Sequence, residues 1–399
     1  MKFLYTYTQK EDFEIKFTTF FGLEEVLANE LKKLGGKDVT PFKRGVSAVG
    51  DIGFLYKCNL NLHTALKVLI PIAKFKAENE QDLYDAIKSL EWEQFLTFDD
   101  TLMIESVANS EAFTHSLFIS QKVKDALVDR FREKFGKRPS VDLVHPGLRL
   151  YVHIYKNEVT VNLDSSGEPL YKRGYRAHIG EAPMKEVLAS GLVKLSGWEP
   201  HQLLIDSMTG SGTIAIEAAI WAAGIPPGYY RDEFGFKRWK NFDEKLYDTI
   251  FDSSIGKISD KAVDILATDS DSQMTQKALT NVKKAKVEDS VKVLHQSFFD
   301  IQPSRSSGVI ILNPPYGERL PVKEIEAMAK EIGSKLKKDF KGFTAWIITS
   351  SPEFIKNIGL RPTRKIQVYN GSLECRYLKY EMYEGSKKAV KNNRENPEL

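Results

Sequence analysis

From residue 182 onward, short apolar runs alternate with segments in which apolar residues recur every three or four positions. The runs predict strands at Leu203–Asp206, Asp264–Thr268, Val291–Leu294, Gly308–Leu312 and Phe343–Thr349. The spaced segments predict helices at Met184–Ser196, Thr213–Ala223, Ser272–Ala285 and about Val322–Lys338. Strands that alternate with helices predict an α/β fold, a mainly parallel sheet covered on both faces. Ligands of such sheets bind where the strands end.

The region before residue 166 mixes both patterns and predicts an α+β fold of two small units. Apolar residues spaced from Phe20 to Leu34 predict a helix that Gly35 and Gly36 end. A second helix is expected at Ser120–Phe135, and the alternating residues of Leu148–Leu163 predict a hairpin.

Composition limits the classes of protein that fit. A chain of 399 residues exceeds the roughly 250–300 that one core supports, so two or three domains are expected. The two cysteines, Cys58 and Cys375, lack a metal-ligand spacing, which fits a reducing cytoplasm and argues against structural zinc. No apolar run reaches the roughly 20 residues of a membrane span, and acidic residues near the N-terminus argue against a signal peptide.

A glycine-containing loop follows the first predicted strand of the α/β region. Asp206 ends that strand, and Gly210 and Gly212 let the backbone approach a ligand before the helix begins at Thr213. The loop lacks the lysine of a phosphate-binding Walker motif and the third glycine of a dinucleotide fingerprint. It therefore suits a small ligand with a positive centre and an amino-acid tail, whose ammonium Asp206 could receive. A tight turn with a capping hydroxyl is the alternative.

The next predicted strand ends at Asp269, whose carboxylate can accept both hydroxyls of a ribose. Asp271 is interpreted as the cap of the helix that follows. A capping role for both carboxylates is the alternative interpretation.

Asn313-Pro314-Pro315-Tyr316 directly follows the buried strand at Gly308–Leu312. The prolines make the loop rigid, and the Asn313 amide oxygen and the Pro314 carbonyl can accept the two hydrogens of an aromatic amine. This makes the amine nitrogen nucleophilic toward a methyl group, while Tyr316 offers a ring for stacking a base taken out of its helix. An inert surface turn is the alternative. No Ser-His-Asp set, HExxH helix or CxxC pair supports metal hydrolysis or a covalent nucleophile.

With these motifs the chain resembles the THUMP-domain class I methyltransferases, specifically the bacterial 23S ribosomal RNA guanine-N2 methyltransferases, which are also catalogued as N6-adenine-specific DNA methylases. Matching blocks lie at Leu163–Gly191, the glycine loop, Gly224–Trp239 and Leu312–Leu320, and the resemblance covers nearly the whole chain. It implies a Rossmann-like catalytic sheet ending in an antiparallel strand near Leu373–Tyr383. The implied organisation is a ferredoxin-like domain at 1–65, a THUMP domain at 66–165, a linker at 166–182, a methyltransferase domain at 183–385 and a flexible tail at 386–399.

The resemblance also implies S-adenosylmethionine as the cofactor, with no metal. Its implied contacts are Asp206, Met208, Thr209, Gly210, Gly212, Thr213, Asp269, Ser270, Ser297 and Asn313, and the implied catalytic residues are Asn313, Pro314, Pro315 and Tyr316. Pro183 and Lys185 would lie over the cofactor. Ser297 stands where many relatives carry an acidic residue for the adenine amine, and Asp300 is a possible substitute. Some relatives carry a second methyltransferase domain, whereas this chain is expected to hold one activity.

Two basic segments are candidates for RNA phosphates. The first is Lys172, Arg173 and Arg176, and the second is Lys122, Lys124 and Arg132 on a predicted helix that also carries acidic residues. For both, a solvated mixed face is the alternative. The aromatic residues of Gly224–Trp239 could stack on RNA or cover a sheet edge.

The leading hypothesis is methylation of a guanine N2 in 23S ribosomal RNA, as naked RNA or as an assembly intermediate, in the cytoplasm. Adenine N6 methylation of DNA uses the same chemistry, and the THUMP-like region favours RNA. A catalytically silent RNA-binding assembly factor is a third possibility, which the intact Asp206, Gly212 and Asn313 oppose.

Overall fold

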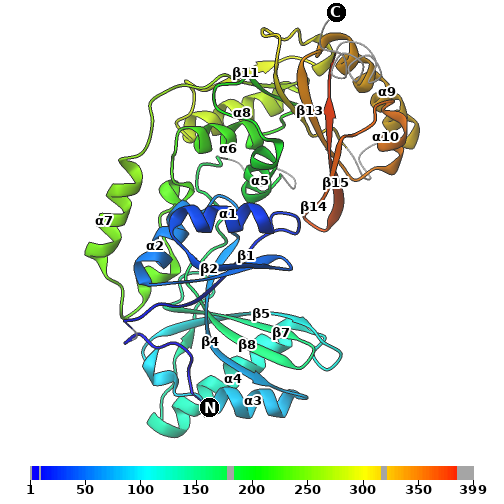
Figure 1. Cartoon of the computed structure of the whole chain (residues 1–399). Coiled ribbons are helices and arrows are strands. Elements are labelled where there is room, and N and C mark those ends of the chain that lie inside the picture. The colour runs from blue at the N-terminus through cyan, green and yellow to red at the C-terminus, as the bar shows by residue number, and fades with distance from the viewer. Residues whose placement is uncertain (1, 9, 178–183, 316–320, 384–399) are drawn as a thin grey trace, which may run out of the picture. The chain divides into compact units, whose positions relative to one another are not determined.

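Two sheets organise the chain (Figure 1). In the computed structural model, residues 2–8, 10–177, 184–315 and 321–383 are described. Contacts divide them into two units. The first contains the described residues of 1–19, 27–174 and 226–256, and the second those of 20–26, 175–225 and 257–399. None of the helices in the described ranges is both long and apolar enough to cross a membrane.

The first unit is built on one sheet of eight strands in the order β2-β3-β1-β4-β8-β7-β5-β6. The strands are β1 Phe13–Thr18, β2 Lys37–Phe42, β3 Gly45–Gly50, β4 Lys67–Lys76, β5 Thr101–Asn109, β6 Ser140–Val141, β7 Leu148–Tyr155 and β8 Glu158–Asp164. β4 pairs with β1 on one side and with β8 on the other. The two small units expected from the sequence therefore share a continuous sheet.

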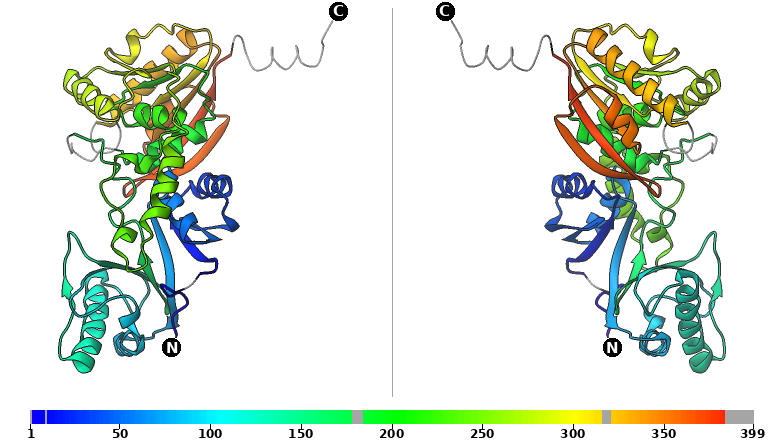
Figure 2. Two further views of the ribbon diagram at one scale, coloured as in Figure 1. Left: turned by 90° about the vertical axis from the view of Figure 1, so that its left-hand side faces the viewer. Right: turned by 90° about the vertical axis from the view of Figure 1, so that its right-hand side faces the viewer.

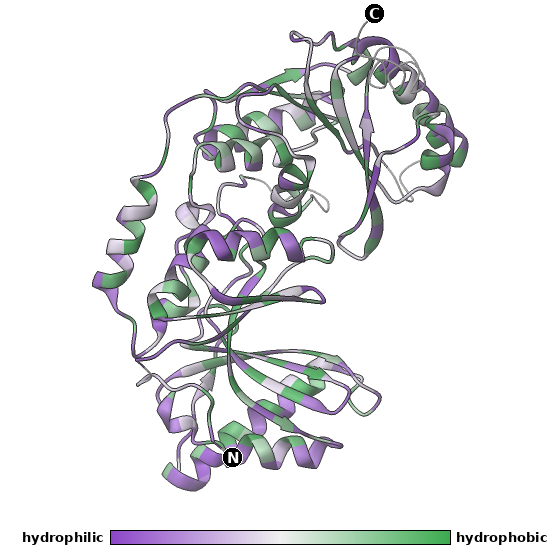
Figure 3. Ribbon diagram, in the orientation of Figure 1, coloured by the Kyte–Doolittle hydropathy of each residue, from purple (hydrophilic) through white to green (hydrophobic). Residues whose placement is uncertain are grey.

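Helices complete this unit. They are α1 Glu24–Leu34, whose first residues belong to the second unit, α2 Ile52–Asn61, α3 Glu80–Ser89, the short η1 Trp92–Gln94, and α4 Ser116–Phe135. The predicted helix at 120–135 is confirmed as α4, which begins one turn earlier and ends where Gly136 is left-handed. The predicted hairpin is confirmed as β7 and β8, joined through Lys156 with a φ of 55°. Hydrophilic and hydrophobic residues both occur along the helices, so their apolar sides can pack inward (Figure 3).

Residues 226–256 interrupt the sequence of the second unit and join the core of the first. They form η2 Pro227–Tyr230, η3 Gly235–Arg238 and α7 Glu244–Ile255, and α7 packs on α2. Phe236 is fully buried, and its ring stacks on Tyr56 with centroids 4.5 Å apart. Phe234 and Trp239 are buried in the same core. The packing alternative for these aromatic residues is therefore confirmed.

The second unit contains a sheet of seven strands in the order β11-β10-β9-β12-β13-β15-β14. These strands are β9 Leu204–Ser207, β10 Ile265–Asp269, β11 Val291–His295, β12 Gly308–Leu312, β13 Phe343–Thr349, β14 Arg364–Asn370 and β15 Leu373–Glu381. The first five are parallel, and β15 is antiparallel to both β13 and β14. The α/β fold and the antiparallel final strand are as predicted.

Helices cover both faces of this sheet (Figures 1 and 2). They are α5 Glu186–Ser196, α6 Thr213–Ala222, α8 Ser272–Lys284, the short η4 Phe298–Asp300, α9 Val322–Asp339 and α10 Pro352–Asn357. Alternate residues of β13 show the two faces. Ala345 and Ile347 share a core with Leu336 of α9, whereas the Trp346 indole donates to the Ser196 carbonyl of α5 at 3.0 Å. Because the strand is buried on both faces, its sequence is a nearly continuous apolar run.

Candidate active site

The sequence-predicted residues gather where three neighbouring strands end. Asp206 on β9 lies beside Ala267 on β10 and Ile311 on β12. The chain runs outward from β9 to β10 and β11, then returns to place β12 on the other side of β9. Such a reversal opens a crevice at the carboxyl ends of the strands, which is where ligands bind in this class of fold.

The glycine loop between β9 and α6 turns through three left-handed residues. Met208, Gly210 and Gly212 have φ angles of 61°, 57° and 82°. A Cβ on Gly212 would stand 3.2 Å from the Ala278 Cβ, whereas a Cβ on Gly210 would meet nothing within 4 Å. Gly212 therefore allows close packing on α8, while Gly210 faces open space that a ligand can enter.

Asp206 is fully buried beneath this loop. Its Oδ2 accepts hydrogen bonds from the Thr209 hydroxyl at 2.5 Å and from the Ala215 amide at 3.1 Å. Its Oδ1 is buried and has no hydrogen-bond partner among the described residues. Burial raises the pKa of Asp206 from 3.8 to about 7, against the lowering effect of these two donors. An unpaired buried carboxylate oxygen is costly unless a ligand donor meets it.

Asp269 ties the end of β10 to the glycine loop. One carboxylate oxygen accepts from the Gly210 amide at 2.8 Å, and the other accepts from the Asp271 amide at 3.0 Å. Each oxygen keeps a second lone pair for a ligand hydroxyl. Asp271 accepts from the first amides of α8, at Gln273 and Met274, so its predicted capping role is confirmed.

Asn313 follows β12, all of whose residues are buried. Its side-chain oxygen is buried and finds no hydrogen-bond partner within the part of the chain that is described. Pro314 is buried and Pro315 is exposed. Tyr316 and Pro183 lie outside the described residues. An amide oxygen held without a partner at the end of a buried strand is suited to accept a hydrogen from a bound molecule.

The remaining predicted cofactor contacts lie along the same edge. The Ser297 hydroxyl accepts from the Phe299 amide at 3.3 Å and so caps η4, and Asp300 is exposed. Ser270 is exposed, and its carbonyl oxygen lies 2.9 Å from the His295 Nε2. Thr213 is buried at the first turn of α6.

Comparison with known families agrees with this arrangement. Residues 173–379 match the family described as RMKL-like, methyltransferase domain. The chain belongs to this family of methyltransferases. Residues 77–164 match the THUMP domain, and residues 14–69 match the RlmL ferredoxin-like domain.

Three relatives illustrate the match to this methyltransferase family. A Synechocystis protein that carries the provisional name of RNA methyltransferase is 37% identical over 364 residues, which cover 91% of this chain and 95% of the relative. The ribosomal RNA large subunit methyltransferase K/L of Syntrophotalea carbinolica is 36% identical over 94% of this chain but 54% of its own length. The chain therefore spans about half of that relative. A crystal structure assigned as a methyltransferase and solved with SAH superposes with a TM-score of 0.84 at 28% identity, covering 95% of this chain and 100% of that one.

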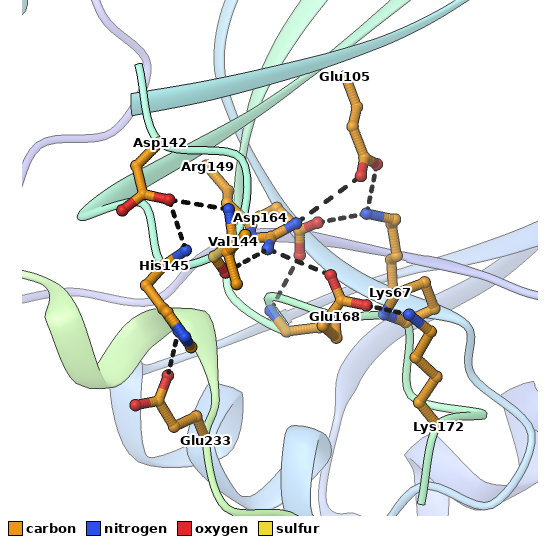
Figure 4. Close-up of polar contacts among 12 residues, drawn as sticks. Lys67, Glu105, Asp142, Val144, His145, Arg149, Asp164, Glu168, Lys172 and Glu233 are labelled. Atoms are coloured by element: carbon orange, nitrogen blue, oxygen red, sulfur yellow. Dashed lines mark hydrogen bonds and ion pairs between the residues drawn. The ribbon is translucent and has the colours of Figure 1, made fainter. Parts of the chain in front are cut away.

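The predicted basic strip of the methyltransferase does not form one surface. Arg173 is 2% exposed and donates to the carbonyls of Leu170 and His63, at 2.9 and 2.6 Å. Lys172 is exposed and pairs with Glu168. Figure 4 shows that Glu168 also pairs with Arg149, at 3.2 Å. Arg173 is therefore occupied by backbone carbonyls, and Lys172 is the exposed cation of the two.

Each predicted cation on helix α4 of the methyltransferase has a partner on α4 itself or on α3. The Lys122 ammonium lies 5.3 Å from the centroid of the Tyr84 ring. Lys124 pairs with Asp125 at 2.7 Å, and Arg132 pairs with Asp129 at 2.9 Å. Arg132 is 55% exposed at its side chain, so it remains open to solvent. These contacts favour a mixed charged face over a purely basic one.

Two residues near the glycine loop make contacts that the sequence did not predict. Arg176, predicted as a phosphate contact, donates instead to Glu186, to the Met184 carbonyl and to the loop hydroxyls of Ser211 and Thr213. Glu217 is fully buried in α6 and accepts from the hydroxyls of Tyr175 and Ser190. A carboxylate inside the otherwise apolar helix at 213–222 was the available signal, because a buried charge requires dedicated partners.

Proposed function

We propose that this methyltransferase transfers a methyl group from S-adenosylmethionine to an exocyclic amino group of a nucleobase, guanine N2 in 23S ribosomal RNA. One observation carries the proposal. Asn313 holds a buried side-chain oxygen that has no partner among the described residues, and it directly follows β12, the strand next to β9, which carries Asp206. The site thus offers one oxygen, on Asn313, for the amine of a base and another, on Asp206, for the ammonium group of the cofactor's amino-acid tail.

The residues present fit S-adenosylmethionine. The unpartnered Asp206 Oδ1 suits an ammonium group, and the open space beside Gly210 admits a ligand close to the backbone. Asp269 keeps lone pairs for the ribose hydroxyls. Ser270 and Ser297, which follow β10 and β11, are expected to face the adenine. The cofactor supplies an electrophilic methyl group, so the chain itself needs no covalent nucleophile.

Asn313 and Pro314 prepare the target amine. Their oxygens accept the two amine hydrogens, which turns the nitrogen lone pair out of ring conjugation and toward the methyl donor. Asn313 is neutral, so it positions the amine without acting as a strong base, and the proton that the amine loses on methylation would pass to water. The base must leave its stack to reach this loop, and Tyr316 is expected to stack on it.

RNA is the favoured substrate because the relatives named above are RNA or ribosomal RNA methyltransferases by name, and residues 77–164 match the THUMP domain. In this proposal, the first unit supplies RNA affinity through Lys172, Lys122, Lys124 and Arg132. DNA adenine N6 methylation uses the same amine chemistry. A catalytically silent assembly factor would need neither the unpartnered oxygen of Asp206 nor that of Asn313.

The experiment compares ribosomal RNA nucleosides, by mass spectrometry, from a deletion strain complemented with the wild type or with Asn313→Ala. The deletion should remove one N2-methylguanosine from 23S RNA, and the wild type should restore it. Asn313→Ala should fail to restore it, because losing a transition-state hydrogen bond costs about 10²–10³ in rate. The purified variant should bind S-adenosylmethionine as the wild type does.

An unchanged methylguanosine profile in the deletion strain would reject the ribosomal RNA assignment. Loss of N6-methyladenine from DNA would favour the DNA alternative. Restoration by Asn313→Ala would support the silent assembly factor or a different catalytic residue.

A further inference from the structure

Arg176 forms hydrogen bonds to the end of the glycine loop that leads into α6. Its guanidinium donates to the Ser211 hydroxyl at 3.2 Å and to the Thr213 hydroxyl at 3.0 Å. It also donates to the Met184 carbonyl at 2.8 Å and to the Glu186 carboxylate at 2.5 Å. Only 15% of the Arg176 side chain is exposed, and 4% of the Glu186 side chain. A planar guanidinium with five donors in a fixed fork can serve four acceptors at once.

The residues on either side of Arg176 are fixed to the same framework. The Tyr175 hydroxyl donates to Glu217 of α6 at 3.1 Å. The Ala177 amide donates to the Asn281 side-chain oxygen at 3.0 Å, and the Asn281 side-chain nitrogen donates to the Ser211 carbonyl at 3.0 Å. Three consecutive residues therefore attach, directly or through one side chain, to the glycine loop or to the helix that follows it.

The loop needs such support because its backbone is unfavourable by itself. A non-glycine residue with a positive φ, as at Met208, persists where its surroundings hold it. Asp206 holds Thr209 and Asp269 holds Gly210 from the strand side. Arg176 holds Ser211 and Thr213 from the other end of the loop. These two groups of contacts fix the path of the loop between Thr209 and Thr213.

We infer that Arg176 is a positioning residue for S-adenosylmethionine, acting through Ser211 and Thr213, with Glu186 as its charge partner. This inference rests on the proposed function. Glu186 has a second consequence, because S-adenosylmethionine carries a sulfonium and an ammonium. An uncompensated arginine beside the loop would repel those cations, whereas the Arg176–Glu186 pair is neutral overall.

The test compares two buried arginines by calorimetric titration with S-adenosylmethionine. Arg176→Lys keeps the positive charge beside Glu186, but one ammonium cannot reach all four acceptors. Arg231→Lys is the matched control, because Arg231 is also mostly buried and donates to four carbonyls, those of Ser166, Glu168, Pro169 and Lys172. These contacts all lie within the first unit, and none of them is made with a residue of the glycine loop.

Arg176→Lys should raise the dissociation constant for S-adenosylmethionine at least about tenfold, since the loss of one charge-assisted hydrogen bond that fixes the loop corresponds to a change of about this size. The KM for this cofactor should rise in parallel, while kcat at saturating cofactor changes less than about threefold and the KM for RNA stays constant. Arg231→Lys should lower the melting temperature by a similar amount and leave cofactor affinity unchanged. If Arg176→Lys does not fold, Arg176→Met with Glu186→Met removes both charges and should show the same loss of affinity.

Wild-type affinity in a folded Arg176 variant would overturn the inference, as would an equal loss of affinity in Arg231→Lys. Failure of the wild type itself to bind S-adenosylmethionine would instead overturn the proposed function, and this inference with it.

Discussion

The buried Asp206 carboxyl should make the methyltransferase less stable as the pH rises. Burial raises the pKa of Asp206 from 3.8 to about 7 in the folded chain, so between these values the folded state binds a proton that the unfolded state has lost. Unfolding free energy therefore falls with increasing pH in this window and levels off above it. At about 1.36 kcal/mol per pKa unit, the full loss is about 4 kcal/mol, of which about 3 kcal/mol falls between pH 5 and pH 8.

Asp206→Asn isolates this effect. The amide oxygen of asparagine can accept from Thr209 and Ala215 as the carboxylate does, but the side chain does not titrate. Urea unfolding of both proteins at pH 5, 6, 7 and 8 should show the wild type losing about 3 kcal/mol more than the variant across the series. Other titrating groups are common to both proteins and cancel in the difference.

Cofactor binding should lower the pKa of Asp206. An ammonium group beside the carboxylate stabilises the ionised form, so S-adenosylmethionine should bind more tightly as the pH rises through 7. Calorimetry near pH 6.5 in two buffers of different ionisation enthalpy should detect proton release in the wild type and none in Asp206→Asn. Parallel stability profiles for the two proteins, or equal proton release, would refute the assignment of this carboxyl.

The other predictions concern the cofactor and the RNA. Asp269→Ala should weaken S-adenosylmethionine binding at least about tenfold by calorimetry, since it removes charge-assisted hydrogen bonds of about 1.5–3 kcal/mol each. Asp271→Ala, which removes only the cap of α8, is its control, and unchanged affinity in Asp269→Ala would exclude this residue from the site. Replacing Lys122, Lys124 and Arg132 with glutamine should weaken RNA binding across sequences and flatten its salt dependence by roughly 0.7–0.9 per lost phosphate contact. An unchanged slope would place the recruiting surface elsewhere.

Strand positions in the catalytic unit could be predicted from the sequence almost to the residue. The strands at 308–312 and 343–349 coincide with the predicted runs, because both are buried on two faces and contain no charged residue. β14 was missed, since its edge position allows the mixed residues Arg364, Lys365 and Gln367, which hide the period. The short α10 and the insertion helix α7 were missed for a related reason. α10 has only six residues, too few to show a helical period. α7 is fixed by its packing on α2, which its own sequence does not reveal.

The meeting of Asp206, Asp269 and Asn313 at one edge of the sheet could be predicted from the sequence, but the contacts of the arginines could not. Asp206 lies near the end of β9, Asp269 ends β10 and Asn313 follows β12, and the ends of parallel strands meet at one edge of a sheet. Arg173 and Arg176 stand near each other in sequence with no local sign of burial. Their partners, such as His63 and Ser211, come from distant segments, so only the folded chain distinguishes a supporting arginine from one facing a phosphate.

The exchange of segments between the two units bears on the order in which the protein can fold as it is synthesised. Phe234 and Phe236 belong to the core of the first unit, yet they follow α5, β9 and α6 of the second. Conversely, Leu23 belongs to the second unit, where its side chain lies against Gly191. Domains ordinarily fold one after another as they leave the ribosome. Here the core of the first unit becomes complete only after residue 256 has emerged, when only β9 of the catalytic sheet has been made and its other six strands, β10 to β15, are still to follow.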